Sequence, residues 1–151
     1  MRMRVFQLVL VVVFASLLAG CGGKSCDSTL PAGGGGTPTI TFTHVPPIGS
    51  GNALEGTVTG VAPCDYDVVV FIYVESAWWV KPYANAQLTP ISCGSGEWSA
   101  NIVTGGDDKD ATKIIAFVVP SSDTNPWSAL VAGPPVTLPG AVASTSVTRT
   151  P

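Results

Sequence analysis

The chain has 151 residues, of which 17 are glycine, 13 are proline and only 11% are charged. This composition disfavours a helical protein and is typical of short β-strands joined by many turns. The formal net charge is −3, and the basic residues are few and scattered, whereas binding to nucleic acid needs clustered lysine and arginine. We therefore expect no nucleic-acid partner.

The first twenty residues have the pattern of an export signal. Arg2 and Arg4 precede an apolar run, residues 5–18, that only Gln7 and Ser16 interrupt. The run is too short to span a hydrocarbon layer of about 30 Å but has the length of a signal-peptide core. We predict that residues 1–20 are a leader, whose removal takes the net charge from −3 to −5 because two arginines leave with it.

The leader ends in Leu18-Ala19-Gly20-Cys21, which resembles the bacterial lipobox at all four positions. The resemblance implies that acyl chains such as palmitate are attached to the Cys21 thiol, that the chain is cleaved before it, and that the new amino terminus is acylated. An ordinary secretory signal with an incidental cysteine is the alternative. Because Gly22 follows the cysteine and not Asp, the resemblance favours a lipid anchor in the outer membrane, facing the periplasm or the exterior.

Residues 21–38 are expected to form a flexible tether between this anchor and the folded domain. The segment contains four consecutive glycines and no apolar periodicity. A coil of this length and composition spans roughly 20–25 Å. The folded domain is expected over residues 39–151.

The sequence after residue 38 predicts an all-β domain, because short β-rich runs alternate with turn residues at regular spacing. In two of these runs, 68–74 and 114–119, the side chains expected on both faces of the strand are apolar, which is typical of strands covered on both faces. The expected strands are 39–45, 53–61, 67–75, 78–81, 88–92, 98–104, 113–119 and 142–149. Trp98, which alternates with Ala100 and Ile102, is expected in the core.

Most of this domain resembles an immunoglobulin-like accessory module found beside extracellular carbohydrate-active enzymes of bacteria. The segments that carry the resemblance are, in order, TFTHVPPIGS, LEGTVTGV, DVVVFIYV, WWVKPY, LTPI, EWSANIVTGG and ATKIIAFVVP. The most specific are Trp-Trp-x-Lys-Pro at 78–82 and Thr-Gly-Gly-x-Asp at 104–108. The resemblance implies an immunoglobulin-like two-sheet β-sandwich of about seven to eight strands with an extracellular, non-catalytic role. The chain departs from it by following a lipobox and by carrying Cys64 and Cys93 at turns.

The cysteines indicate one structural cross-link. With Cys21 acylated, three cysteines remain in an oxidising compartment. Cys64 and Cys93 both lie in turn-like contexts of the folded domain, so we predict a disulfide between them, worth about 3 kcal/mol in the chain-entropy model. Cys26 would then be free or bonded to a partner chain. A zinc site is disfavoured because no Cys-x2-Cys spacing occurs and His44 is the single histidine.

Acidic and nucleophilic residues do not form a recognisable catalytic pattern. Asp107, Asp108 and Asp110 lack the alternate spacing of a calcium loop, so a solvated turn is expected there. His44 has no nucleophile elbow to activate, and the glutamates lie singly on different predicted strands. We expect no enzymatic activity, no cofactor and no bound metal.

Aromatic residues are the candidates for ligand recognition. Trp78 and Trp79 are adjacent, so in a strand their side chains point to opposite faces and at most one enters the core. Trp79 precedes Val80 and the point at Lys81-Pro82 where the chain leaves the predicted strand, which favours Trp79 as the core residue. Trp78 would then either be covered by the loop at 126–127, closing the sandwich, or form a surface on which a sugar ring stacks.

The sequence leaves two functions open. In the first, the anchored domain binds glycan or cell-envelope polysaccharide through Trp78 or Trp79, with Tyr83 extending the aromatic surface and Asn85 and Gln87 supplying hydrogen bonds. In the second, the chain is a structural or protein-interaction lipoprotein of the cell envelope that docks an envelope protein and binds no glycan. In both, the lipid anchor places the protein on a membrane.

Overall fold

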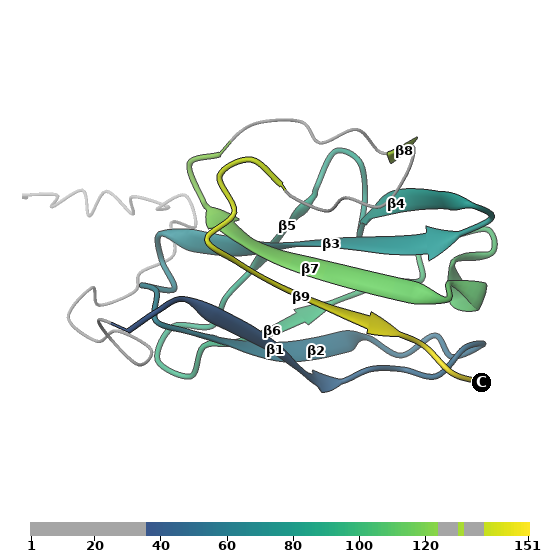
Figure 1. Cartoon of the computed structure of the whole chain (residues 1–151), viewed down its shortest axis with the longest axis horizontal. Helices are drawn as coiled ribbons and strands as arrows, with labels where there is room; N and C mark the ends of the chain where they lie inside the picture. The colour runs from purple at the N-terminus through teal and green to yellow at the C-terminus, as the bar shows by residue number, and fades with distance from the viewer. Residues whose placement is uncertain (1–35, 124–129, 132–137) are drawn as a thin grey trace, which may run out of the picture.

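A computed structural model describes residues 36–123, 130–131 and 138–151 (Figure 1). The leader, Cys21, Cys26 and the tether up to residue 35 lie outside the described residues. The described residues form the elements β1 (Thr39–His44), β2 (Leu54–Thr59), β3 (Tyr66–Val74), β4 (Ala77–Lys81), β5 (Leu88–Pro90), β6 (Glu97–Ala100), the 3-10 helix η1 (Asp108–Asp110), β7 (Lys113–Pro120), β8 (Leu130–Val131) and β9 (Ala143–Thr148).

All eight strands expected from the sequence are present, and β8 is an additional short one. The largest difference in bounds is at β6, which ends at Ala100 and was expected to continue to residue 104. Beyond Ala100 the backbone bonds to side chains: the amide of Val103 donates to Asn101, and the amide of Thr104 donates to Asp108. These bonds replace a strand ladder, so the segment forms a loop.

The strands make two antiparallel sheets. One sheet has the order β1-β2-β6, and the larger one has the order β8-β4-β3-β7-β9, with β5 also pairing with β3. Strands β4 and β5 follow one another along the same side of β3, because β4 pairs with residues 70–74 and β5 with residues 67–69. Figure 1 shows the two sheets as stacked layers. The order β1-β2-β6 against β4-β3-β7-β9 is the Greek-key arrangement of an immunoglobulin-like sandwich, which confirms the expected fold class.

Strand β3 is buried on both faces, as its uninterrupted apolar sequence predicted. Val68, Val70 and Ile72 face the other sheet and belong to the main core. Val69 and Phe71 face the opposite way and belong to a second apolar cluster on the outer face of the larger sheet, which also contains Trp78, Val80, Phe117 and Val119. Each fully buried valine or isoleucine contributes about 1.5–3 kcal/mol, so β3 stabilises the sandwich on two sides.

Trp98 of β6 lies in the main core, 3% exposed, as expected. Its indole packs edge-on against Phe42, with ring centroids 6.1 Å apart, and covers Gly56 of β2. A Cβ atom on Gly56 would lie 2.5 Å from the Trp98 ring and 2.3 Å from the Thr41 carbonyl oxygen. Glycine is therefore required at this inward position of β2, between the buried side chains of Leu54 and Val58.

The two ends of the sandwich carry different parts of the chain. Figure 1 shows the start of β1 at one end and, at the other, η1, the turn between β3 and β4, and the carboxyl terminus. The turn consists of Glu75 and Ser76, both with positive φ (51° and 66°), between the paired residues Val74 and Ala77. Positive φ at both central residues is the geometry of a type I′ hairpin turn, which keeps β4 twisted closely along β3.

Candidate functional site

The adjacent tryptophans of β4 lie on opposite faces of the larger sheet, as strand geometry predicts. The expectation that Trp79 is the core residue was wrong: Trp78 is 5% exposed, whereas Trp79 is 36% exposed. Trp78 packs in the outer-face cluster beside Tyr73, with ring centroids 5.2 Å apart. Trp79 pairs across the ladder with the core residue Ile72. The three-stranded sheet is narrower than the larger one, however, and does not cover the Trp79 ring on β4.

Trp79 borders a hollow of about 310 Å³ at the end of the sandwich that carries η1. One wall comes from the β3–β4 hairpin, through Val74, Glu75 and Trp79. The other comes from the loop between β6 and β7, residues 104–108. We call this space the Trp79 hollow. It combines an exposed indole with carboxylates, a hydroxyl and backbone of a glycine-rich loop.

A buried ion pair joins the two walls of the Trp79 hollow. The Lys81 ammonium donates to the Asp108 carboxylate, and the two residues are 6% and 7% exposed. Lys81 also donates to the Thr104 hydroxyl at 3.1 Å. The same Asp108 oxygen accepts the backbone N–H groups of Thr104, at 2.9 Å, and Gly105, at 3.0 Å. The pair therefore fixes the loop against β4.

The ionisation of Asp108 follows from these contacts. Burial would raise the pKa of its carboxyl. The hydrogen bond and positive charge of Lys81 and the donors of Thr104 outweigh burial and hold the pKa of Asp108 below its usual range. The expectation that Asp108 belongs to a solvated turn was wrong, because the carboxylate faces inward to the lysine. Asp107 and Asp110, its neighbours, are exposed.

Arg149 holds the same loop from the opposite side. It is 4% exposed, and its guanidinium donates to four backbone carbonyl oxygens. These belong to Pro46 (2.9 Å), Pro47 (2.6 Å), Lys109 (3.3 Å) and Ala111 (2.9 Å). Arg149 thus ties the end of β9 to the β1–β2 loop and to η1. Two buried cations, one on each side, fix the backbone that forms one wall of the Trp79 hollow.

The other predicted ligand-binding residues lie in the loop between β4 and β5 and do not line the Trp79 hollow. Tyr83 is 53% exposed, and Asn85 is exposed. Gln87 is buried, and its Nε2 donates to the Ala84 carbonyl at 2.9 Å, so it supports the loop. The five residues singled out in the sequence therefore do not form one site. Only Trp79 borders the hollow.

The sequence did contain a signal for the residues that were missed. Lys81 belongs to the Trp-Trp-x-Lys-Pro segment, and Asp108 belongs to the Thr-Gly-Gly-x-Asp segment. These are the two most specific elements of the resemblance, and the structure brings them into contact as the ion pair. Glu75, which also lines the hollow, had no such signal.

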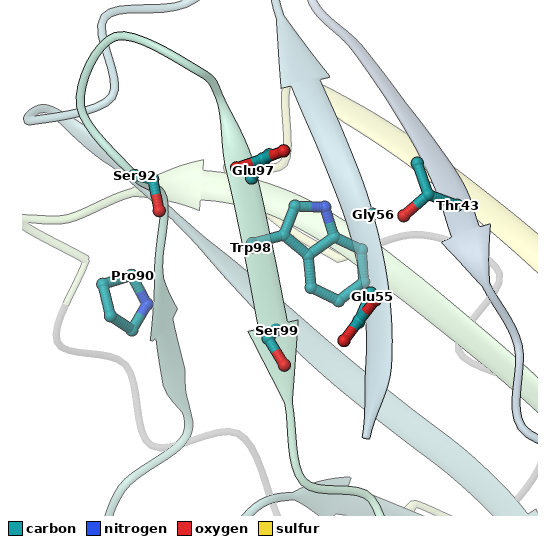
Figure 2. A pocket seen from close by; sticks show the side chains of 8 residues that line it. All are labelled: Thr43, Glu55, Gly56, Pro90, Ser92, Glu97, Trp98 and Ser99. Atoms are coloured by element: carbon teal, nitrogen blue, oxygen red, sulfur yellow. The ribbon is translucent and has the colours of Figure 1, made fainter. Parts of the chain in front are cut away.

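A second hollow, of about 350 Å³, lies at the three-stranded sheet. Figure 2 shows its lining side chains from β2 and β6 together with Thr43, Pro90 and Ser92. It contains the carboxylates of Glu55 and Glu97, but its one aromatic ring, Trp98, is buried in the core. A stacking ligand would find no exposed ring there, so the Trp79 hollow is the better candidate site.

The structure brings Cys64 and Cys93 together, as the predicted disulfide requires. Their Sγ atoms lie 3.8 Å apart, compared with about 2.05 Å for a disulfide bond. The cysteines lie in the loops before β3 and before β6, at the end of the sandwich opposite η1. The pairing stays a prediction, placed far from the Trp79 hollow.

Comparison with protein-family models, with characterised proteins and with solved structures finds no match for the chain. Among the described residues, no group of three or more potential metal ligands occurs. The same part of the chain contains no helix that is long and apolar enough to cross a membrane.

Proposed function

We propose that the protein is a lipid-anchored, non-catalytic lipoprotein of the cell envelope whose β-sandwich binds glycan in the Trp79 hollow. The observation that carries the proposal is the exposed indole of Trp79 at the edge of a hollow whose lining also supplies carboxylates, the Thr104 hydroxyl and the backbone of two glycines. Sugar rings present an apolar face that stacks on indole and hydroxyl groups that bond to carboxylates and backbone. A volume of about 310 Å³ falls at the lower end of the usual range for ligand sites.

Preorganisation supports this assignment. A loop that must be ordered on binding reduces affinity, because the lost conformational entropy offsets the new contacts. Here Lys81 and Arg149 fix the loop between β6 and β7 from both sides before any ligand arrives. The wall of the hollow is then already in place when a sugar ring meets Trp79.

The position of the hollow also fits an anchored binding protein. The tether predicted over residues 21–38 leads to the start of β1, and the Trp79 hollow lies at the opposite end of the sandwich (Figure 1). If Cys21 is acylated, the hollow lies at the end of the domain away from the tether, where the attachment does not obstruct it. Cys21→Ala is expected to abolish incorporation of labelled fatty acid, and continued incorporation into this variant would refute the anchor.

The binding test uses the full chain in detergent with a panel of immobilised polysaccharides and electrophoretic retardation. Trp79→Ala is expected to abolish retardation while changing the melting temperature by only a few degrees, since the ring is partly exposed. Gly105→Leu is a second test variant, because Gly105 lines the hollow and a Cβ at this position meets nothing within 4 Å. Its side chain enters open space beside the hollow without displacing the fold.

Tyr83→Ala serves as the comparison, because it removes an exposed ring that lies outside the Trp79 hollow. Retardation should persist in this variant. Loss of binding in Tyr83→Ala but not in Trp79→Ala would move the site to the β4–β5 loop. If no polysaccharide retards the wild-type chain, the glycan proposal fails and the structural or protein-interaction role becomes the better one.

A further inference from the structure

The charged groups of the Trp79 hollow are unevenly distributed between its interior and its surface. Three carboxylates, those of Glu75, Asp107 and Asp108, and one ammonium, that of Lys81, line it. Lys81 and Asp108 are buried and neutralise each other. Glu75 and Asp107 are exposed. A ligand that approaches the indole therefore meets two acidic side chains and no accessible cation among the described lining residues.

Neighbouring cations do not offset this charge. Lys109 is exposed on η1, and its ammonium lies 3.5 Å from the carboxylate of Asp110. Lys113 lies over the ring of Tyr73, 5.5 Å from its centroid, and Tyr73 packs against the outer-face cluster and not toward the hollow. Arg149 is buried and bonded to backbone carbonyls. Each described cation near this end of the sandwich is engaged elsewhere.

We propose that the glycan bound in the Trp79 hollow carries a protonated amine, as in an amino sugar whose nitrogen is not acetylated. This inference rests on the proposed glycan function and names its ligand class. An ammonium group is attracted to the face of an indole and forms charge-assisted hydrogen bonds with carboxylates. Glu75 and Asp107 supply these carboxylates from opposite walls of the hollow. The same two side chains repel uronate, sulfate and phosphate groups.

The test compares two oligosaccharides of equal length, one of glucosamine and one of N-acetylglucosamine, titrated into the full chain in detergent. The two share the same pyranose ring and differ at the nitrogen, which is an ammonium in one and a neutral acetamide in the other. Two exposed ion pairs and one cation–π contact, each worth a few-fold, predict about tenfold tighter binding of the glucosamine oligomer at low salt. The difference should shrink as salt is raised, because exposed charges are screened.

The variants Glu75→Gln and Asp107→Asn should each reduce this preference about twofold, and the double variant should leave only the small contribution of the cation–π contact, while Trp79→Ala abolishes binding of both oligomers. Glu97→Gln is the matched control, because it neutralises an exposed carboxylate of the other hollow and should leave the preference unchanged. Equal affinities for the two oligomers, both lost in Trp79→Ala, would overturn the inference and leave the glycan function standing.

Two other outcomes would also overturn it. If neither oligomer nor any other glycan binds, the proposed function fails together with the inference. If polylysine binds in a manner that requires Trp79 and Glu75 while glucosamine oligomers do not, the acidic hollow recognises basic protein segments and the protein-interaction role is correct.

Discussion

Removing the ammonium of Lys81 is the sharpest test of how the Trp79 hollow is built. Lys81→Met keeps the apolar stem and leaves Asp108 ionised, buried and without its cation. Breaking one side of a buried pair typically costs about 3–5 kcal/mol. Because the N–H groups of Thr104 and Gly105 still donate to the carboxylate, we expect a loss at the lower end, about 3 kcal/mol. For a domain of this size that corresponds to a fall in melting temperature of roughly 12–24 °C.

Equilibrium urea unfolding measures the change directly. Lys109→Met is the matched control, since this lysine lies on η1 and pairs with Asp110 at 3.5 Å, with about half of each side chain exposed. It should change the free energy of unfolding by less than about 0.5 kcal/mol. A double-mutant cycle with Asp108→Asn isolates the coupling. If Lys81→Met unfolds like Lys109→Met and the coupling is near zero, the ion pair does not hold the loop.

The pair also predicts a pH dependence. The pKa of Asp108 is lowered in the folded protein, so its contribution to stability is present above the unfolded value of about 3.9 and is lost as the pH falls through the folded value. Without Lys81, burial opposes ionisation more effectively and the pKa of Asp108 rises. The wild type should therefore lose more stability than Lys81→Met as the pH falls through this range, so that the difference in unfolding free energy between the two proteins shrinks in acid. Identical acid profiles of the two proteins would contradict this account.

Three further predictions concern the remainder of the fold. Trp78→Ala should cost about 3–5 kcal/mol in urea unfolding, because it empties the centre of the outer-face cluster; a small effect would show that this cluster does not support the sandwich. Gly56→Ala should destabilise the protein by about 1–3 kcal/mol through clashes with the Trp98 ring and the Thr41 carbonyl oxygen, and unchanged stability would mean that both β1 and the indole shift freely. Peptide mapping without reduction should recover Cys64 linked to Cys93, whereas a link from Cys26 to either would refute the pairing.

Local pattern was enough to predict most of the strands and the opposite faces of Trp78 and Trp79. It did not show which face is covered. That depends on the width of the second sheet and on residues distant in sequence, such as Leu138 and Ala141, which pack on the outer-face cluster. The period-2 alternation of a strand contains no information about what lies above each face, so the choice of Trp79 for the core failed.

The ion pair between Lys81 and Asp108 could not be predicted from local sequence for a related reason. Asp107, Asp108 and Asp110 look alike in sequence, and a run of acidic residues after two glycines is usually a solvated turn. The loop places Asp108, and not its neighbours, against β4, where Lys81 lies 27 positions earlier in the chain. Neither residue has a sequence context that requires the other. Their contact follows from the tertiary structure, which places the β6–β7 loop against β4.

This dependence constrains how the protein can evolve. Replacing Lys81 alone leaves a buried carboxylate without its cation, and replacing Asp108 alone leaves a buried ammonium without its anion, so each single change lowers stability. Replacing both by apolar residues would still leave the N–H groups of Thr104 and Gly105 without their acceptor. The two positions should therefore be inherited as a unit: descendants that keep the lysine should keep the aspartate. In contrast, Asp107 is exposed and can change without loss of the fold, whereas the positive φ of Glu75 restricts which residues the β3–β4 turn accepts.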